Sequence, residues 1–162
     1  MYSTAEALEV YAREADLIIG AVLIPGASAP KLVTAEMLAE FKPGTVMVDV
    51  AIDQGGCFET SRQTTHADPT YVVNGVVHYC VANMPGAAAR TATMALTNAS
   101  LPYIMRLASD EVGSLLLEDR HFAAGLNIVH GQLTHRAVAD ALGQTWTEPD
   151  QILRASLHLK SA

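Results

Sequence analysis

Apolar residues gather in short runs along the chain, and turn residues separate these runs. The first run, Asp16–Ile24, ends at Pro25-Gly26, and the second, Val46–Asp53, ends at Gly55-Gly56. A nearly continuous apolar run of this length is typical of a parallel strand whose two faces are both covered. The pattern therefore predicts two buried strands, each followed by a loop of turn residues.

Helices are predicted before and between these two runs. Ser3-Thr4-Ala5-Glu6 has the form of a capping box, which predicts a helix from Thr4 to about Arg13. Thr34 can cap a short helix through Phe41, which would join the two strands in a parallel crossover. We therefore expect the loops after Leu23 and Asp53 to open at the same edge of one sheet.

The middle of the chain carries a hairpin signal. Thr70–Val73 and Val76–Ala82 flank Asn74-Gly75, a dipeptide that favours a two-residue hairpin turn. A third loop, Asn83–Gly86, follows, and then an Ala-, Leu- and Met-rich helix is predicted over about Arg90–Leu107. Farther along, the pattern predicts three more elements: a short helix near Leu115–Arg120, a hairpin at His130-Gly131 and a helix around Ala137–Leu142.

This order of elements predicts an α/β protein with a Rossmann-like, doubly wound parallel sheet. A complete dinucleotide-binding fold opens with a strand, a Gly-x-Gly-x-x-Gly turn and an acid about 20 residues later. This sequence opens with a predicted helix instead, which is typical of the second half of such a sheet. We expect residues 1–109 to form that half and residues 110–162 to be a helical return segment and tail leading toward a substrate domain.

Composition narrows the classes of partner. Half of the residues are apolar, 17% are charged, and the net charge of -7 argues against nucleic-acid binding. The sequence contains neither an apolar run long enough to cross a membrane nor the pattern of a secretory signal, so we expect a cytoplasmic protein without a membrane partner. Cys57 and Cys80 fit no metal or redox spacing, and the six histidines are unclustered, so we expect reduced thiols and no metal.

Asp53 is the first candidate for a working carboxylate. Ligands of open parallel sheets lie outside the carboxyl ends of the strands, and a Gly-Gly step lets the backbone approach a bound group. An acid after a strand can also cap a helix or face water. Asp49 lies in the same apolar run and, as two strand residues four apart share a face, either acid could instead be a buried structural partner.

Three blocks of the sequence resemble the NAD-dependent alanine dehydrogenases. They are Ala15–Gly26, Met47–Cys57 and His78–Gly86, and their order and spacing match that family. The resemblance continues through Ala95–Ala99 and Ala137–Leu142, so it covers most of the chain. It implies an oxidoreductase that interconverts L-alanine and NAD with pyruvate, ammonia and NADH, with a homo-oligomer, commonly a hexamer, as its assembly.

The resemblance also implies roles for particular residues. The aspartate of the Ile-Asp-Gln-Gly-Gly block is catalytic in the family, and this position is Asp53. The implied contacts to the cofactor NAD are Ser3, Val22, Leu23, Val50, Ala51, Ile52, Asp53, Arg62, Val81, Ala82, Asn83 and Met84. Two of these have simpler explanations, because a capping box accounts for Ser3 and a lone loop arginine such as Arg62 is usually solvated.

The sequence departs from the family in what precedes the first block. The Gly-rich turn, the ribose-binding acid and the substrate-domain histidine, lysine and arginine would lie upstream. We therefore expect a C-terminal fragment of an alanine dehydrogenase that is inactive by itself. The alternatives are the NAD-binding subunit of proton-translocating transhydrogenase, which shares the fold, and a non-catalytic assembly partner of an intact subunit.

Overall fold

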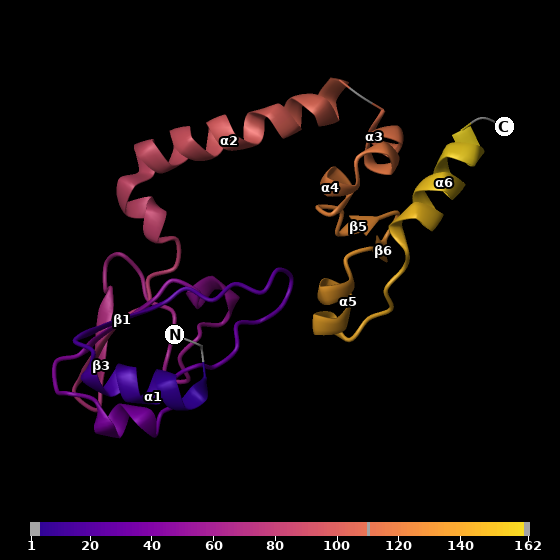
Figure 1. The fold of residues 1–162 in the computed structure, drawn as a ribbon. Helices are drawn as coiled ribbons and strands as arrows, with labels where there is room; N and C mark the ends of the chain where they lie inside the picture. Colours follow the sequence, from indigo (N-terminus) through magenta and orange to yellow (C-terminus); the bar gives the residue numbers. More distant parts are fainter. Residues whose placement is uncertain (1–3, 110, 161–162) are drawn as a thin grey trace. The chain divides into compact units, whose positions relative to one another are not determined.

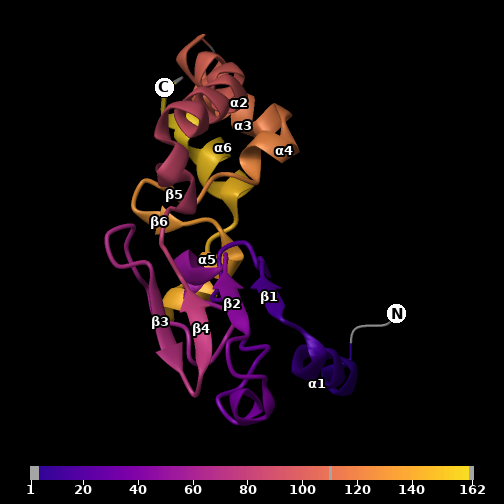
Figure 2. The same cartoon turned by 90° about the vertical axis from the view of Figure 1, so that its left-hand side faces the viewer.

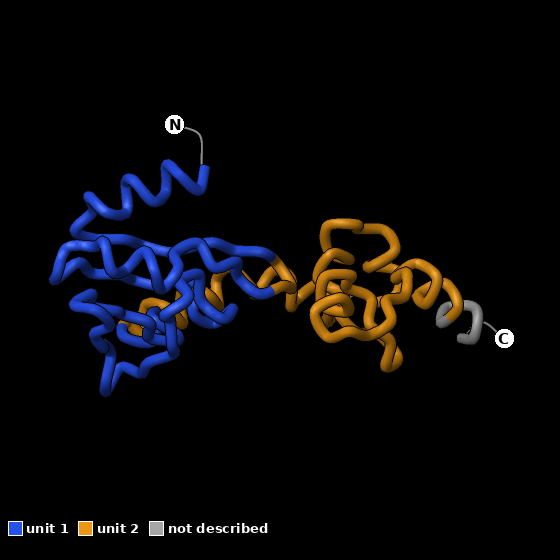
Figure 3. Tube along the Cα trace, turned by 90° about the horizontal axis from the view of Figure 1, so that it is seen from below, with its two compact units in different colours: residues 1–24, 28–87 blue, residues 25–27, 88–162 orange. Residues whose placement is uncertain are grey.

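The computed structural model describes residues 4–109 and 111–160. The chain divides into two compact units, one made of Met1–Ile24 with Ser28–Ala87 and the other of Pro25–Ala27 with Ala88–Ala162 (Figure 3). The first unit contains a mixed sheet and the second is mainly helical (Figure 1). All of the described residues that the sequence singles out for cofactor or catalysis belong to the first unit.

A four-stranded sheet organises the first unit (Figure 2). Its strands, in spatial order, are β1 (Leu17–Gly20), β2 (Val46–Asp49), β4 (Val76–Tyr79) and β3 (Thr70–Val73). β2 pairs in parallel with both β1 and β4, whereas β3 pairs antiparallel with β4. The predicted α/β class with a mostly parallel sheet is confirmed, and the loops after β1 and β2 do leave the sheet at one edge.

Both strands that carry the predicted loops are shorter than expected. β1 ends at Gly20 and β2 ends at Asp49, so the predicted strand residues up to Asp53 instead form a turn and the short 3-10 helix η2 (Ile52–Gln54). The prediction that Asp49 and Asp53 lie on one strand is therefore wrong. The physical reason is that the Asp49 carboxylate accepts a hydrogen bond from the Ala51 amide, which turns the chain.

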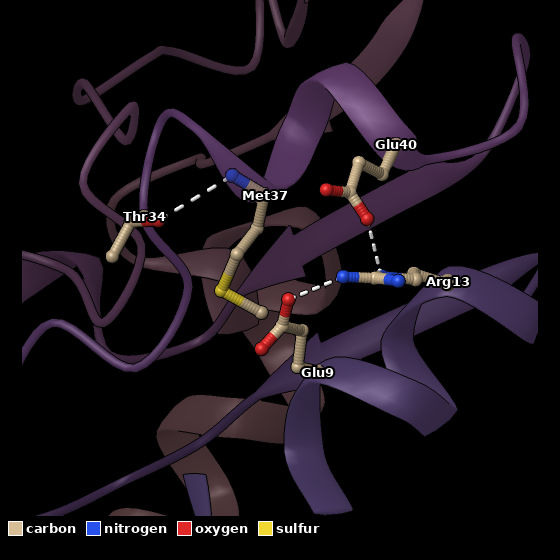
Figure 4. Close-up of polar contacts among 5 residues, drawn as sticks. All are labelled: Glu9, Arg13, Thr34, Met37 and Glu40. Carbon is tan, nitrogen blue, oxygen red and sulfur yellow. Dashed lines mark hydrogen bonds and ion pairs between the residues drawn. The ribbon is translucent and has the colours of Figure 1, made fainter. Parts of the chain in front are cut away.

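The helix before β1 is α1 (Ala5–Glu14), and Thr4 caps it by accepting a hydrogen bond from the Ala7 amide at 3.1 Å. The predicted cap Ser3 lies outside the described residues. The predicted crossover helix is reduced to the 3-10 helix η1 (Met37–Glu40), which Thr34 opens by accepting from the Met37 amide. Arg13 pairs with Glu9 of its own helix and with Glu40 of η1, which ties α1 to the crossover (Figure 4).

One face of the sheet is buried and the other is open. The buried face carries Met47 and His78, and the core beside it includes Ala12 of α1 and Leu38 of η1. On the opposite face Leu17, Ile19 and Val72 are 55%, 62% and 63% exposed. The prediction that β1 is covered on both faces is therefore wrong for this chain, because alternate residues of a strand point to opposite faces and only one face has a covering layer.

The hairpin prediction is confirmed. Asn74 and Gly75 join β3 to β4 with φ values of 50° and 79°, the left-handed conformation that a type I′ turn requires at both positions. β4 ends earlier than predicted, at Tyr79, and Val81 forms only an isolated bridge with Thr64. Through this bridge the Thr60–Thr64 segment lies beside the end of β4.

The second unit contains most of the helices. A 3-10 turn, η3 (Met84–Ala88), leads into α2 (Ala89–Ser109), which agrees closely with the predicted long helix. The remaining elements are α3 (Val112–Glu118), α4 (Arg120–Ala123), β5 (Ile128–Val129), β6 (Gln132–Leu133), α5 (Arg136–Leu142) and α6 (Pro149–Lys160). The domain boundary expected after residue 109 stays a prediction. Among residues 4–109 and 111–160, no helix combines the length and apolarity needed to span a bilayer.

Asp119 explains why the helix predicted near Leu115–Arg120 is broken in two. It ends α3, and its carboxylate accepts hydrogen bonds from the His121 and Phe122 amides at the start of α4, both at 3.0 Å. Arg106 pairs with the same carboxylate at 2.9 Å, and these hydrogen bonds lower the pKa of Asp119. The predicted hairpin at His130-Gly131 and the helix after it are confirmed, with α5 starting one residue early.

Candidate functional site

Three loops leave the carboxyl ends of the parallel strands, and they carry ten of the twelve predicted cofactor residues. An eleventh, Arg62, lies beside them. Val22 and Leu23 follow β1, Val50 to Asp53 follow β2, and Val81 to Met84 follow β4. Because the three strands are adjacent and parallel, the loops lie at one edge of the sheet. Among these residues Ala51, Ile52 and Val81 are buried, Val22, Ala82 and Met84 are half-buried, and Leu23, Val50, Asp53, Arg62 and Asn83 are exposed.

Arg62 reaches this edge by another route. β3 runs antiparallel to β4, so its first residues, Thr70 and Tyr71, lie beside the carboxyl end of β4. The Arg62 amide donates to the Tyr71 hydroxyl at 2.8 Å, and the Arg62 guanidinium lies over the Tyr71 ring at 4.0 Å from its centroid. The sheet therefore brings the predicted cation to the same edge as the three loops.

Asp49, the last residue of β2, is the structural centre of the site. Its side chain is fully buried. One carboxylate oxygen accepts from the Ala51 amide at 3.0 Å, and the other accepts from the Cys57 amide at 2.9 Å and the Ser61 hydroxyl at 2.5 Å. The Phe58 amide also points at the second oxygen, at 3.4 Å. Of the two acids in the run, Asp49 is thus the buried structural partner.

Asp53 has the opposite surroundings. It lies in η2, it is exposed, and its carboxylate has no hydrogen-bond or ion-pair partner within residues 4–109 and 111–160. The turn that carries it is nevertheless well held, because the Gln54 and Gly56 amides both donate to the Ala51 carbonyl at 3.0 Å. Asp53 is therefore a free carboxylate on a fixed backbone, which suits acid–base chemistry on a bound molecule.

The glycine pair after Asp53 is required by the backbone. Gly55 and Gly56 have φ values of 88° and 74°, which side-chain-bearing residues rarely adopt. A Cβ on Gly56 would also lie 2.7 Å from a carboxylate oxygen of Asp49, whereas a Cβ on Gly55 would meet nothing within 4 Å. Gly56 is therefore needed for space as well as conformation, and Gly55 for conformation alone.

Lys31 holds the glycine pair from outside. Its ammonium donates to the Gly55 carbonyl at 2.5 Å and to the Gly56 carbonyl at 2.8 Å. The backbone on either side is tied in register, since the Ala29 amide donates to the Gln54 carbonyl and the Leu32 amide to the Cys57 carbonyl. The loop after β1 thus braces the loop after β2.

Both cysteines are free and buried, as expected of reduced thiols. Burial, and then the neighbouring Asp49 carboxylate, raise the pKa of the Cys57 thiol from 9.0 to about 11, so the thiol stays protonated. Across the described part of the chain no three His, Cys, Asp or Glu side chains come close enough to hold a metal ion. The absence of a metal stays a prediction.

Sequence reasoning missed Lys31, Ser61 and Tyr71. Each acts through a contact with a residue 9 to 25 positions away, and no local sequence motif predicts such a contact. Ser61 and Tyr71 join Asp49 and Arg62 into one network, because Tyr71 and Ser61 both contact the Cys80 thiol. Knowledge that the Thr60–Thr64 segment runs beside β4 would have identified Ser61 and Tyr71, but not Lys31.

Comparisons with known proteins agree with this arrangement. The family model described as alanine dehydrogenase/PNT, C-terminal domain, matches residues 1–136. The alanine dehydrogenase of Halomonas elongata is 64% identical over 153 residues, which cover 94% of this chain and 41% of that protein. A solved L-alanine dehydrogenase superposes with a TM-score of 0.71 at 49% identity, covering 88% of this chain and 39% of the other.

A more distant likeness is to the crystal structure of a transhydrogenase from Sinorhizobium meliloti. That match has a TM-score of 0.51 and 36% identity, and it covers 56% of this chain and 25% of the other. The chain therefore spans about two fifths of the length of these dehydrogenases, and the part of it that matches the transhydrogenase covers a quarter of that protein.

Proposed function

From the premise that this chain belongs to the alanine dehydrogenase/PNT C-terminal domain family, we propose that it supplies the catalytic acid and nicotinamide-side loops of an NAD-dependent alanine dehydrogenase. The observation that carries the proposal is the contrast between the two acids of one loop. Asp49 is saturated with hydrogen-bond donors, whereas Asp53 is exposed and unpaired among the described residues.

The loops fit a dinucleotide in their chemistry. Neither the N–H nor the carbonyl of Leu23 bonds to another described residue, so both are available to a ligand. The side-chain oxygen of Gln54, next to Asp53, is buried and lacks a donor within the described chain. Main-chain groups of Val22–Leu23 and Val81–Asn83 would contact the nicotinamide and its ribose through those groups that have no protein partner. The Ala82 amide and the Asn83 carbonyl are not among them, because they already bond to the Thr64 carbonyl and the Gly86 amide.

The reaction assigns a task to Asp53. Oxidation of L-alanine moves a hydride from the substrate carbon to NAD, and water then adds to the resulting imine to give pyruvate and ammonia. A carboxylate beside that carbon can orient the water and accept its proton. The hydrogen bonds to the Ala51 carbonyl would fix the backbone from which the Asp53 side chain reaches the substrate.

The test is an assay of the natural gene product that carries this chain, purified from its own cells. Alanine-dependent NADH formation is measured for the wild type, for Asp53→Asn and for Asp68→Asn. Asp68 is a matched control, because it is an exposed acid of the same unit whose carboxylate also has no described partner. We expect a loss of about 100-fold or more in kcat for Asp53→Asn and none for Asp68→Asn.

Two results would contradict the proposal. The first is a wild-type product that shows no alanine-dependent turnover. If that product instead transfers hydride between two nucleotides in the absence of alanine, the transhydrogenase alternative is supported. The second is full activity in Asp53→Asn. We also expect the 162-residue chain alone to be inactive, and NADH formation by the chain alone would refute that expectation. Elution of the chain together with the intact enzyme would indicate an assembly role.

A further inference from the structure

Three side chains stack at the carboxyl edge of the sheet. The Arg62 guanidinium lies 4.0 Å from the centroid of the Tyr71 ring. The Tyr71 ring also stacks on the His78 ring, with centroids 4.9 Å apart and an interplanar angle of 20°. Tyr71 and His78 are direct cross-strand partners of β3 and β4, so the sheet itself sets the position of the lower two layers.

The Tyr71 hydroxyl fixes the backbone beneath Arg62. It accepts from the Arg62 amide at 2.8 Å and donates to the Thr60 carbonyl at 2.9 Å. Tyr71 therefore contacts, and helps to position, both the backbone and the side chain of Arg62. An exposed arginine without such contacts would sample many rotamers, and ordering it on binding would cost free energy.

His78 anchors the bottom of the stack. It is fully buried, and its Nδ1 lies 3.0 Å from the Val76 carbonyl while its Nε2 lies 2.8 Å from the Thr60 hydroxyl. A carbonyl can only accept, so Nδ1 carries the proton and Nε2 accepts from Thr60. Burial lowers the pKa of His78, and the Arg62 charge lowers it further, so the imidazole is neutral and does not repel the guanidinium.

We propose that Tyr71 is a positioning residue that presents Arg62 to the phosphate or ribose oxygens on the adenosine side of the bound dinucleotide. The proposal rests on the proposed function. The Arg62 guanidinium lies over the ring at 4.0 Å and makes no hydrogen bond or ion pair to another described residue, so its N–H groups are available to bond to phosphate or to a ribose hydroxyl. Tyr71 is therefore expected to act on cofactor affinity through Arg62.

The test is a calorimetric titration of the natural gene product with NADH. We expect Tyr71→Leu to raise Kd about fivefold, and Tyr71→Phe, which keeps the ring and loses the hydroxyl, to raise it about twofold. In an Arg62→Ala background, Tyr71→Leu should add nothing, because the residue through which it acts is absent. Tyr11→Leu, an exposed aromatic of the same unit, should leave Kd unchanged.

Other readouts separate positioning from a general loss of structure. In Tyr71→Phe, KM for alanine should stay near the wild-type value while KM for NAD rises. The thermal midpoint should fall only by the loss of the two hydrogen bonds to the Arg62 amide and the Thr60 carbonyl, without a loss of cooperative unfolding. Arg62→Lys, which leaves the hairpin intact but removes the planar group, should match Tyr71→Leu in Kd. If Tyr71→Leu does not fold, Tyr71→Phe and Arg62→Lys still decide the question.

The outcomes that overturn the proposal are distinct. A wild-type product that does not bind NADH overturns the proposed function and the positioning proposal together. A wild-type product that binds NADH, with unchanged Kd in the Tyr71 variants, overturns the positioning proposal alone. Additive effects of Tyr71→Leu and Arg62→Ala also overturn it, because additivity means that Tyr71 does not act through Arg62.

Discussion

Replacing Asp49 by asparagine should destabilise the fold, although the two side chains have the same shape. Asparagine has one acceptor oxygen, and its NH2 group must occupy the other position. The less costly placement puts the NH2 where one oxygen now accepts from the Ala51 amide at 3.0 Å. Two donors then face each other, and the buried Ala51 N–H loses its acceptor.

The magnitude follows from the bonds that change. The bond to Ala51 is lost, and those from Cys57 and Ser61 pass from a charged to a neutral acceptor. A hydrogen bond to a charged group contributes about 1.5–3 kcal/mol, against about 1 kcal/mol for a neutral one. Together with the orphaned amide, the change should lower the free energy of unfolding by about 3–5 kcal/mol, a large share of a typical domain's stability.

Urea unfolding followed by circular dichroism measures this loss, and Asp53→Asn is the matched control four residues away. Because Asp53 is exposed and unpaired in the described structure, its substitution should change stability by less than about 0.5 kcal/mol. Hydrogen exchange adds a local readout, since the Ala51, Cys57 and Phe58 amides should lose protection in Asp49→Asn only. Equal stability of the two variants, or unchanged protection of these amides, would refute the assignment of Asp49 as the structural acid.

Two further perturbations test the same loop. Gly56→Ala should lower the free energy of unfolding by at least about 2 kcal/mol, and by more than Gly55→Ala does, because only the Gly56 Cβ would lie 2.7 Å from Asp49. Similar unfolding midpoints for the two variants would contradict this expectation. The pKa of the Cys57 thiol is about 11 in the folded protein, against an ordinary value of 9.0. As pH rises above about 9, the thiol of the unfolded chain loses its proton before that of the folded chain. The folded state therefore loses stability between about pH 9 and pH 11. Relative to Cys57→Ala, the wild type should therefore lose roughly 1.4 kcal/mol between pH 8 and pH 10, and parallel pH profiles would count against a raised pKa.

Features encoded within a few residues could be predicted from the sequence. Asn74-Gly75 and His130-Gly131 carry their own turn conformation, and both hairpins are present. The apolar runs located the strands, and parallel pairing then placed three loops at one edge. The strand order β1-β2-β4-β3 needed the structure, because the sequence alone did not say which strand β4 joins.

The end of β2 could not be predicted from hydrophobicity. Val50, Ala51 and Ile52 continue the apolar run, so the pattern extended the strand to Asp53. In the structure the Asp49 side chain accepts from the amide two residues later, a local hydrogen bond with which aspartate favours a turn over a strand. Ala51 and Ile52 remain buried in the turn, each 6% exposed, whereas Val50 is exposed. Burial alone therefore could not distinguish the strand from the turn.

The turn also decides which acid is free to react. Had the strand run to Asp53, the two carboxylates would share a face, and nothing in the pattern would give them different surroundings. Ending the strand at Asp49 directs the Ala51 and Cys57 amides and the Ser61 hydroxyl onto that one carboxylate. The Asp49 oxygens are buried and occupied by these donors, so this carboxylate is not available to a bound molecule. The hydrogen bonds that occupy Asp49 also help to hold the turn that carries Asp53, so the structural role of Asp49 and the catalytic role proposed for Asp53 follow from one local change in the path of the chain.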